Sequence, residues 1–224
     1  MPLYFDKFGD YRPIGLFYLS GLMQLILGSS VTSVRLVTAF FGSFTVFILY
    51  LFARELFRKK EIAYLSCLFL AILPWDIVLS RDVHEAIVGY FFTIAGFYFI
   101  FKFSIDGKRV KHLLIGGGLL FVSYFFYHGI RALTPLLLII FWFFYRERKI
   151  ALVTLIFLVL TFAIVLSSHG GGRFGQVVFY KSPTIEQKLN ELPFADSNLI
   201  LARVFHNKAV VYSRSVFSSW IEHF

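Results

Sequence analysis

The sequence predicts an all-α bundle of helices that crosses a lipid bilayer several times. Hydrophobic residues make up 58% of the 224 residues and charged residues only 16%, whereas a soluble domain usually carries about 25% charged residues. The 30 phenylalanines are too many for the core of one small domain. Apolar runs alternate along the chain with short clusters of Lys and Arg. Because this much apolar surface needs an apolar solvent, the helices are expected to lie in lipid.

Six apolar runs approach the roughly 20 residues that a helix needs to cross a bilayer. The predicted spans are Leu36–Ala53, Ile62–Leu79, Ala86–Phe101, Leu113–Tyr127, Ala132–Tyr145 and Ile150–Leu166. The fourth and fifth are short, and we expect aromatic and snorkelling side chains to complete their ends. Pro74 and Pro135 lie inside runs, which membrane helices tolerate when neighbours satisfy the freed carbonyl groups. The triplet Gly116–Gly118 is expected to allow close helix packing.

The first apolar run, Ile14–Leu27, is different because its fourteen residues are too short for a span. As a helix they would reach only about 21 Å. Ser20 and Gln24 share one face of this helix, and another face carries Leu16, Leu19, Met23 and Leu27. This pattern predicts a helix that lies in the membrane interface, with Pro13 in its first turn and Gly28 at its end.

Basic residues fall on alternate connections between the predicted spans. Eleven of them share one side: Arg54, Arg58, Lys59, Lys60, Lys102, Lys108, Arg109, Lys111, Arg146, Arg148 and Lys149. The turns on the opposite side hold only Arg81 and Arg131. The positive-inside rule makes the eleven residues cytoplasmic and both termini extracytoplasmic. The net charge of +9 therefore indicates membrane topology and not nucleic-acid binding.

Three regions follow from this topology in a multi-pass protein of the plasma membrane. Residues 1–33 are predicted to form an extracytoplasmic loop and the interfacial helix, and residues 34–168 the transmembrane domain. Residues 169–224 are predicted to form a small extracytoplasmic segment. Within that segment, Ser182-Pro183 starts a short helix that Pro193 stops, and Ala209–Phe224 is a second helical stretch.

Three polar clusters lie on the predicted extracytoplasmic side. Their members are Asp6, Asp10, Tyr11 and Arg12; Asp76, Ser80, Arg81, Asp82, His84 and Glu85; and Tyr127, His128 and Arg131. Ionisable groups at the ends of apolar helices are costly unless they are paired, hydrated or functional. Arginine suits a phosphate, and carboxylates suit a metal or a base. Together the clusters predict a site for an anionic group that is attached to a lipid.

Each cluster also has a purely structural interpretation. Arg12 and Arg35 would snorkel to lipid headgroups, and His128 would be a hydrogen-bonded histidine at the interface. Asp82 would cap the start of the third span, with Glu85 three residues further on as in a capping box. The sequence contains no HExxH, CxxC or GxSxG pattern.

Several stretches resemble the bacterial dolichyl-phosphate-mannose-protein mannosyltransferase-like proteins. The resemblance is most specific in the first third, where Arg12-Pro13 is followed by Leu27-Gly28, Arg35 and the Tyr50-to-Arg54 span end. The stretches that carry it are GDYRPIGLFYLSGLMQLILGSSVTSVRLVTAFFGSFTVFILYLFARELF, ILPWDIVLSRDVHEA, FYHGIRALTPLLL and, more weakly, ARVFHNKAVVYSR. These relatives are glycosyltransferases of the GT-C fold, of family 39 and of the aminoarabinose-transferase type.

This resemblance implies a GT-C-like enzyme that transfers a sugar from a polyprenyl phosphate to an extracytoplasmic acceptor, either a protein or a lipid or glycan. Arg12 matches the basic residue that contacts the lipid phosphate in the family, with Arg81 and Arg131 as weaker candidates. Glu85 matches an acidic residue near the active site. Glu85 and His128 are the candidate metal ligands, and the need for a divalent metal stays open.

The family's catalytic aspartate lies in a loop upstream of the segments matched here, and Asp6 and Asp10 do not match its motif. The family also continues with further spans, so we expect this chain to be truncated at both ends. Asp10 and Glu85 are the acidic residues that remain as catalytic candidates. Two other functions stay open, a transporter or flippase of a lipid-linked solute and an inactive membrane scaffold.

Overall fold

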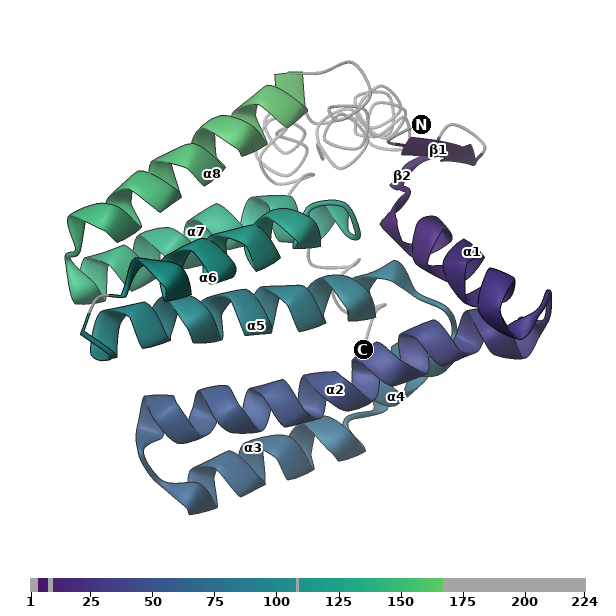
Figure 1. Ribbon diagram of the computed structural model, residues 1–224, viewed down its shortest axis with the longest axis horizontal. Coiled ribbons are helices and arrows are strands. Elements are labelled where there is room, and N and C mark those ends of the chain that lie inside the picture. Colours follow the sequence, from purple (N-terminus) through teal and green to yellow (C-terminus); the bar gives the residue numbers. More distant parts are fainter. Residues whose placement is uncertain (1–3, 8–9, 108, 167–224) are drawn as a thin grey trace, which may run out of the picture. The chain divides into compact units, whose positions relative to one another are not determined.

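The computed structural model describes residues 4–7, 10–107 and 109–166, and side chains for 12–107, 109–164 and 166. The chain divides into two units, Met1–Ile164 and Val165–Phe224. The described residues form a small β-hairpin and eight helices, α1 to α8 (Figure 1). The helices predicted after Ser182 and within Ala209–Phe224 lie outside the described residues.

A β-hairpin that the sequence did not predict precedes the first helix. Strand β1 (Tyr4–Lys7) pairs antiparallel with β2 (Asp10–Pro13), so that Phe5 lies opposite Arg12. The predicted loop therefore has regular backbone pairing at this point. Strand β2 leads directly into the first helix, and its pairing fixes the backbone of Arg12.

Helix α1 (Gly15–Leu27) occupies the predicted short apolar run. The placement of Pro13 in its first turn was wrong, because Pro13 ends β2 and Ile14 is the N-cap. The helix begins only at Gly15, whose N–H donates to the carbonyl of Phe125 at 3.0 Å. It ends at Gly28, whose φ of +85° glycine adopts without strain.

Each predicted span overlaps one helix, except Ile62–Leu79, which overlaps two. The helices are α2 (Val31–Phe57), α3 (Lys60–Ile72) with α4 (Pro74–Arg81), α5 (Glu85–Ile105), α6 (Val110–Ser123), α7 (His128–Tyr145) and α8 (Arg148–Leu166). In the described part of the chain, α2, α5 and α7 are each long and apolar enough to cross a membrane. The bent pair of α3 and α4 makes a fourth if it is one span.

The predicted span Ile62–Leu79 is not a continuous helix, because it bends by 55° between α3 and α4. Pro74 is the first residue of α4, and Leu73 before it has an extended backbone with ψ of 119°. A residue that precedes proline disfavours the helical conformation, which is why α3 stops here. Pro74 therefore starts a new helix and is not an internal residue of one span.

Pro135, by contrast, lies inside α7 and leaves the helix continuous. Because proline lacks an N–H, the carbonyl four residues earlier, at Arg131, loses its helical partner. Two hydroxyls from elsewhere replace that partner, Tyr124 Oη at 3.3 Å and Thr161 Oγ1 of α8 at 2.9 Å. The two hydroxyls are themselves 2.9 Å apart. This confirms the expectation that neighbours satisfy the carbonyl which the proline frees.

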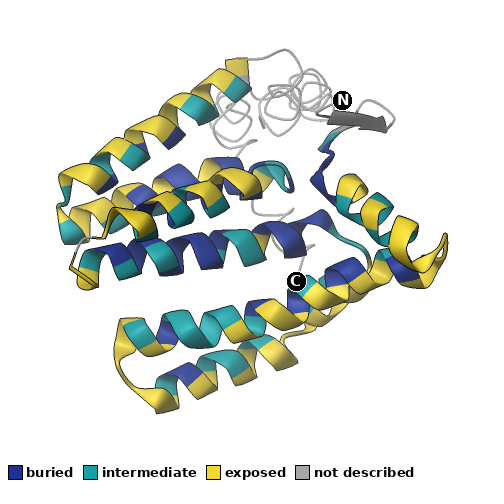
Figure 2. Cartoon of the chain, in the orientation of Figure 1, coloured by how far each residue is buried: buried dark blue, intermediate teal, exposed yellow. Residues whose placement is uncertain are grey.

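Helix α5 is more deeply buried than the other two candidate spans, α2 and α7, and much of the surface of the other helices is exposed (Figure 2). Many of the exposed side chains are large and apolar. Leu25, Phe69 and Phe144 are 86%, 66% and 76% exposed. A water-soluble protein seldom leaves so many large apolar side chains uncovered. The outer surface is therefore suited to lipid.

Close packing at the glycine triplet is confirmed at one position. A Cβ atom at Gly116 would lie 2.8 Å from the carbonyl oxygen of Gly96 in α5, whereas positions 117 and 118 have open space. Only a glycine lets the two backbones approach this closely.

We predict that the hydroxyls of Tyr124 and Thr161 stabilise the protein because Pro135 leaves the Arg131 carbonyl without its helical partner. Tyr124→Phe and Thr161→Val should each lower the free energy of unfolding by about 1 kcal/mol. In a Pro135→Ala background, position 135 regains an N–H that bonds to the Arg131 carbonyl, so the same changes should cost less. Thermal unfolding in detergent measures both series, with Ser43→Ala on the exposed face of α2 as control. Equal costs in the two backgrounds would contradict the assignment.

Candidate functional site

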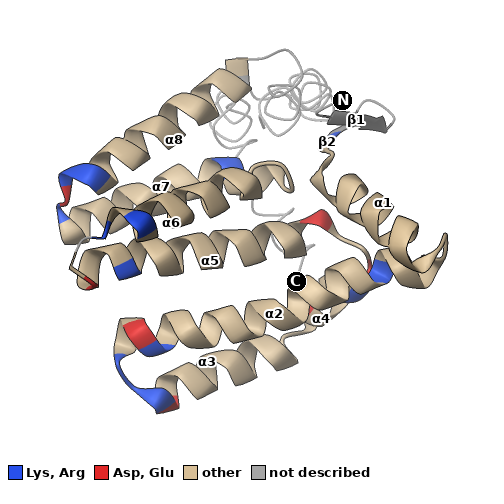
Figure 3. Ribbon diagram, in the orientation of Figure 1, with Lys and Arg blue, Asp and Glu red and all other residues tan. Residues whose placement is uncertain are grey.

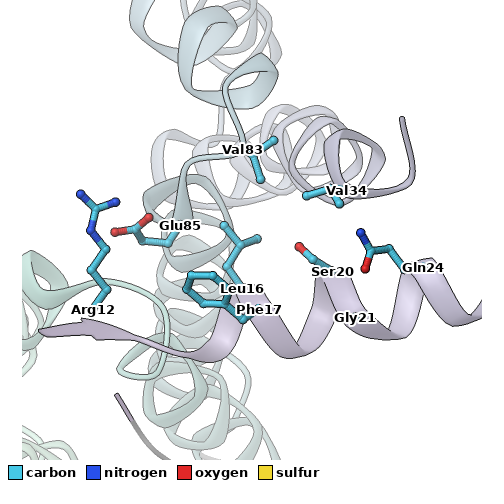
Figure 4. A pocket seen from close by; sticks show the side chains of 9 residues that line it. All are labelled: Arg12, Leu16, Phe17, Ser20, Gly21, Gln24, Val34, Val83 and Glu85. Atoms are coloured by element: carbon cyan, nitrogen blue, oxygen red, sulfur yellow. The ribbon is translucent and has the colours of Figure 1, made fainter. Parts of the chain in front are cut away.

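A pocket of about 310 Å³ lies along α1, between this helix, the start of α2 and the connection from α4 to α5 (Figure 4). Its charged residues are Arg12 and Glu85. The other residues that line it are Leu16, Phe17, Ser20, Gly21, Gln24, Val34 and Val83. The volume is near the lower end of the range of about 300–1,000 Å³ that is common for small-molecule sites.

Arg12 and Glu85 are brought together although they are 73 positions apart (85 − 12) in the sequence. Their side chains point toward one another at one end of the pocket (Figure 4). Glu85 is only 8% exposed and lies in the first turn of α5. The partial positive charge at a helix N-terminus favours a carboxylate there. A cation and a buried anion therefore face the same small cavity.

The cap of α5 differs from the predicted capping box. His84 is the N-cap, and its Nδ1 accepts a hydrogen bond from the N–H of Ala86 at 3.2 Å. Asp82 instead terminates α4, where its N–H donates to the carbonyl of Val78 at 2.9 Å. The positive φ of 53° at Val83 turns the chain between the two helices, so the capping role predicted for Asp82 was wrong.

Arg12 is held in place by the residues that follow it. Pro13, Ile14, Gly15 and Leu16 are all buried. Leu16 packs in an apolar cluster with Val37, Val88 and Phe126. Since the next residues are docked in this way, the backbone of Arg12 has little freedom, and its side chain enters the pocket from a fixed point.

The predicted polar face of α1 also belongs to this pocket. Ser20 and Gln24 both line it, although neither residue was predicted to belong to a site. The signal that marked them was their spacing of four residues in an otherwise apolar helix. Leu16, which was predicted to belong to the apolar face, lines the pocket as well because it lies four residues before Ser20.

Arg131 lies at the start of α7, is 8% exposed and braces the turn between α6 and α7. Its Nε donates to the carbonyl of Tyr124 at 2.9 Å, and one terminal nitrogen lies 3.2 Å from Nδ1 of His128. Neither Arg131 nor His128 lines the described pocket.

The remaining predicted site residues are also apart from the pocket. Arg81 is exposed at the end of α4, and Asp10 lies in β2 with its side chain outside the described residues. Of the predicted phosphate-binding arginines, only Arg12 lines the pocket with Glu85.

The described residues do not fit a metal centre. No group of three His, Cys, Asp or Glu side chains comes together among them. Nδ1 of His128 faces the guanidinium of Arg131, which leaves it unsuited to a cation. Glu85 is thus the one candidate metal ligand from the sequence that lines the described pocket, and no step of the proposed chemistry is assigned to a metal.

The basic connections lie away from the pocket. Within the described helices, the Lys and Arg residues of the α2–α3, α5–α6 and α7–α8 connections lie at one end (Figure 3). Glu85 and Arg131 open α5 and α7 at the opposite end. The pocket is therefore remote from the most basic part of the described chain.

Comparison with protein families identifies a match over most of the chain. The family model described as dolichyl-phosphate-mannose-protein mannosyltransferase matches residues 11–169, a range that contains Arg12, Glu85 and all eight described helices. Searches of curated proteins and of solved structures found no match. The matched range is well over half of the chain. The chain therefore belongs to the dolichyl-phosphate-mannose-protein mannosyltransferase family, whose members are membrane glycosyltransferases of the GT-C type.

Proposed function

We propose that the pocket binds the phosphate of a polyprenyl-phosphate-linked sugar, and that the sugar passes from it to an extracytoplasmic acceptor. The observation that carries this proposal is that Arg12 and the buried Glu85 line one cavity. The family supports it, because a polyprenyl-phosphate-linked donor is the substrate that its description implies.

Arg12 would bind the phosphate directly. A guanidinium forms two parallel hydrogen bonds to phosphate oxygens, which fixes both the position and the orientation of the group. When the bond between the sugar and the phosphate breaks, negative charge grows on the leaving phosphate. A cation that is already in place stabilises this charge in a site with little water, and so lowers the barrier.

Glu85 would orient Arg12 and would not bind the phosphate itself, since two anions in one small cavity repel. Its carboxylate is buried at the positive end of α5 and faces the guanidinium across the pocket (Figure 4). A fixed anion holds the flexible arginine side chain in one conformation before the donor arrives, which reduces the entropy lost on binding.

The pocket is assigned to the extracytoplasmic side by the positive-inside rule, because the basic connections are at the other end of the helices. A transporter is a weaker alternative. The broken α3–α4 pair is a feature that transporters share, but their substrate sites lie near the middle of the bilayer. Here the charged residues of the pocket lie at the ends of secondary-structure elements.

Arg12→Ala should weaken the binding of polyprenyl phosphate to the purified protein by about 10- to 100-fold, because a charge-assisted hydrogen bond is lost. Arg12→Lys should lose less, since it keeps the charge and loses the bidentate geometry. Arg35→Ala is the matched control, because Arg35 is an exposed arginine at the start of α2 that does not line the pocket. Binding that is equally weak in the Arg12 and Arg35 variants would remove Arg12 from the site.

Cysteine labelling tests the proposed side of the membrane. Single cysteines at two exposed positions, Asp82→Cys and Arg148→Cys, are introduced after the native thiol is removed by Cys67→Ala. A membrane-impermeant maleimide should label position 82 in intact cells and position 148 only after permeabilisation. Labelling of both positions from the same side, or in the reverse pattern, would contradict the topology.

A further inference from the structure

The hydroxyl of Ser20 differs from the other hydroxyls of the described helices. Most of these donate to the carbonyl four residues earlier in their own helix, which is the usual arrangement for Ser and Thr in apolar helices. The residues that do so are Ser43, Thr45, Ser66, Ser80, Thr93, Ser104 and Thr154. Ser20 Oγ is buried and has no hydrogen-bond partner among the described residues.

The Ser20 hydroxyl is placed where a ligand in the pocket can form a hydrogen bond with it. Thr134 Oγ1 also has no partner among the described residues, but Thr134 is 0% exposed in the interior beside Pro135. Ser20 instead lies on the wall of the pocket (Figure 4). A polar atom that is removed from water without a partner is costly. A ligand in the pocket would supply the missing hydrogen bond.

Gln24 extends this polar wall by one helical turn. Residues 16, 20 and 24 follow one another on the same face of α1, so the wall runs for about 12 Å from Leu16 to Gln24. Gly21 lies between the two polar residues, and a Cβ atom there would meet nothing within 4 Å. The pocket thus has a charged end at Arg12 and Glu85, and a neutral polar side at Ser20 and Gln24 (Figure 4).

We infer that Ser20 and Gln24 bind hydroxyl groups of the sugar on the donor, and so contribute to the choice of sugar. This inference rests on the proposed function, which places the phosphate at Arg12. A hydroxyl and a carboxamide each donate and accept hydrogen bonds without charge, which matches sugar hydroxyls and does not match isoprene units. The cavity of about 310 Å³ suits one sugar ring with its phosphate, and not a long lipid chain.

This assignment predicts that variants of Ser20 and Gln24 bind the sugar-loaded carrier and the bare carrier differently. A site that is built to hydrogen-bond a hydroxyl discriminates strongly against ligands without it, because its own polar groups are then left unpaired. Removing Ser20 Oγ or the Gln24 amide should therefore affect the sugar-loaded carrier and leave the bare carrier unaffected. Arg12 should affect both, since both contain the phosphate.

The experiment measures the affinity of the purified full chain for bare polyprenyl phosphate, and for the carrier loaded with mannose, glucose or aminoarabinose. The variants are Ser20→Ala, Gln24→Leu and Arg12→Ala, with Ser43→Ala as the matched control for loss of a hydroxyl. Ser20→Ala and Gln24→Leu should each weaken binding of the best-bound loaded carrier by about fivefold. Binding of the bare carrier should be unchanged, and a melting curve confirms that each variant is folded.

The outcomes separate this inference from the proposed function. Ser20→Ala and Gln24→Leu could bind every loaded carrier as tightly as the unchanged protein does, while Arg12→Ala binds all of them weakly. That result would overturn the sugar-binding role and leave the phosphate site in place. An equal loss for bare and loaded carriers, or no preference of the unchanged protein for any loaded carrier, would also overturn the sugar-binding role. If Arg12→Ala changes neither affinity, it is the proposed function that fails.

Discussion

The structure depends most on one close approach of two backbones, where the N–H of Gly15 donates to the carbonyl of Phe125. A Cβ atom at position 15 would lie 2.6 Å from that oxygen and 2.9 Å from the ring of Phe126, so there is no room for a side chain. This contact docks the start of α1 on the turn between α6 and α7. Arg12 lies three residues earlier, and its position follows from this docking.

The turn that receives α1 is itself held from several directions. The Arg131 guanidinium bonds to the carbonyl of Tyr124, and the Arg131 carbonyl, freed by Pro135, accepts from Tyr124 and Thr161. Helices α6, α7 and α8 therefore share one polar network. We attribute to Arg131 the role of a brace, because its Nε donates to the carbonyl of Tyr124 in this turn.

The sequence predicts the helices well because apolar runs of membrane length and basic connections are local signals. It also selects Arg12 and Glu85, which the structure places on one pocket. The β-hairpin, the His84 cap and the brace at Arg131 were not predicted. The hairpin and the cap depend on local turns, and the brace depends on contacts between distant residues, such as Tyr124 with Thr161. The pattern of apolar and charged residues contains no signal for either. The sequence predicted that Ser20 and Gln24 share a polar face of α1, but only the structure shows that this face lines the pocket.

The central claim is that the docking of α1 at Gly15 positions Arg12 to bind a phosphate. Gly15→Ala tests it most directly, with Gly117→Ala as control, because a Cβ atom at position 117 meets nothing within 4 Å. We predict that Gly15→Ala weakens the binding of polyprenyl phosphate by about tenfold, comparable to the loss of a hydrogen bond to a charged group. Gly117→Ala should leave this binding unchanged. If the Gly15→Ala protein binds polyprenyl phosphate as tightly as the unchanged protein, the account is contradicted.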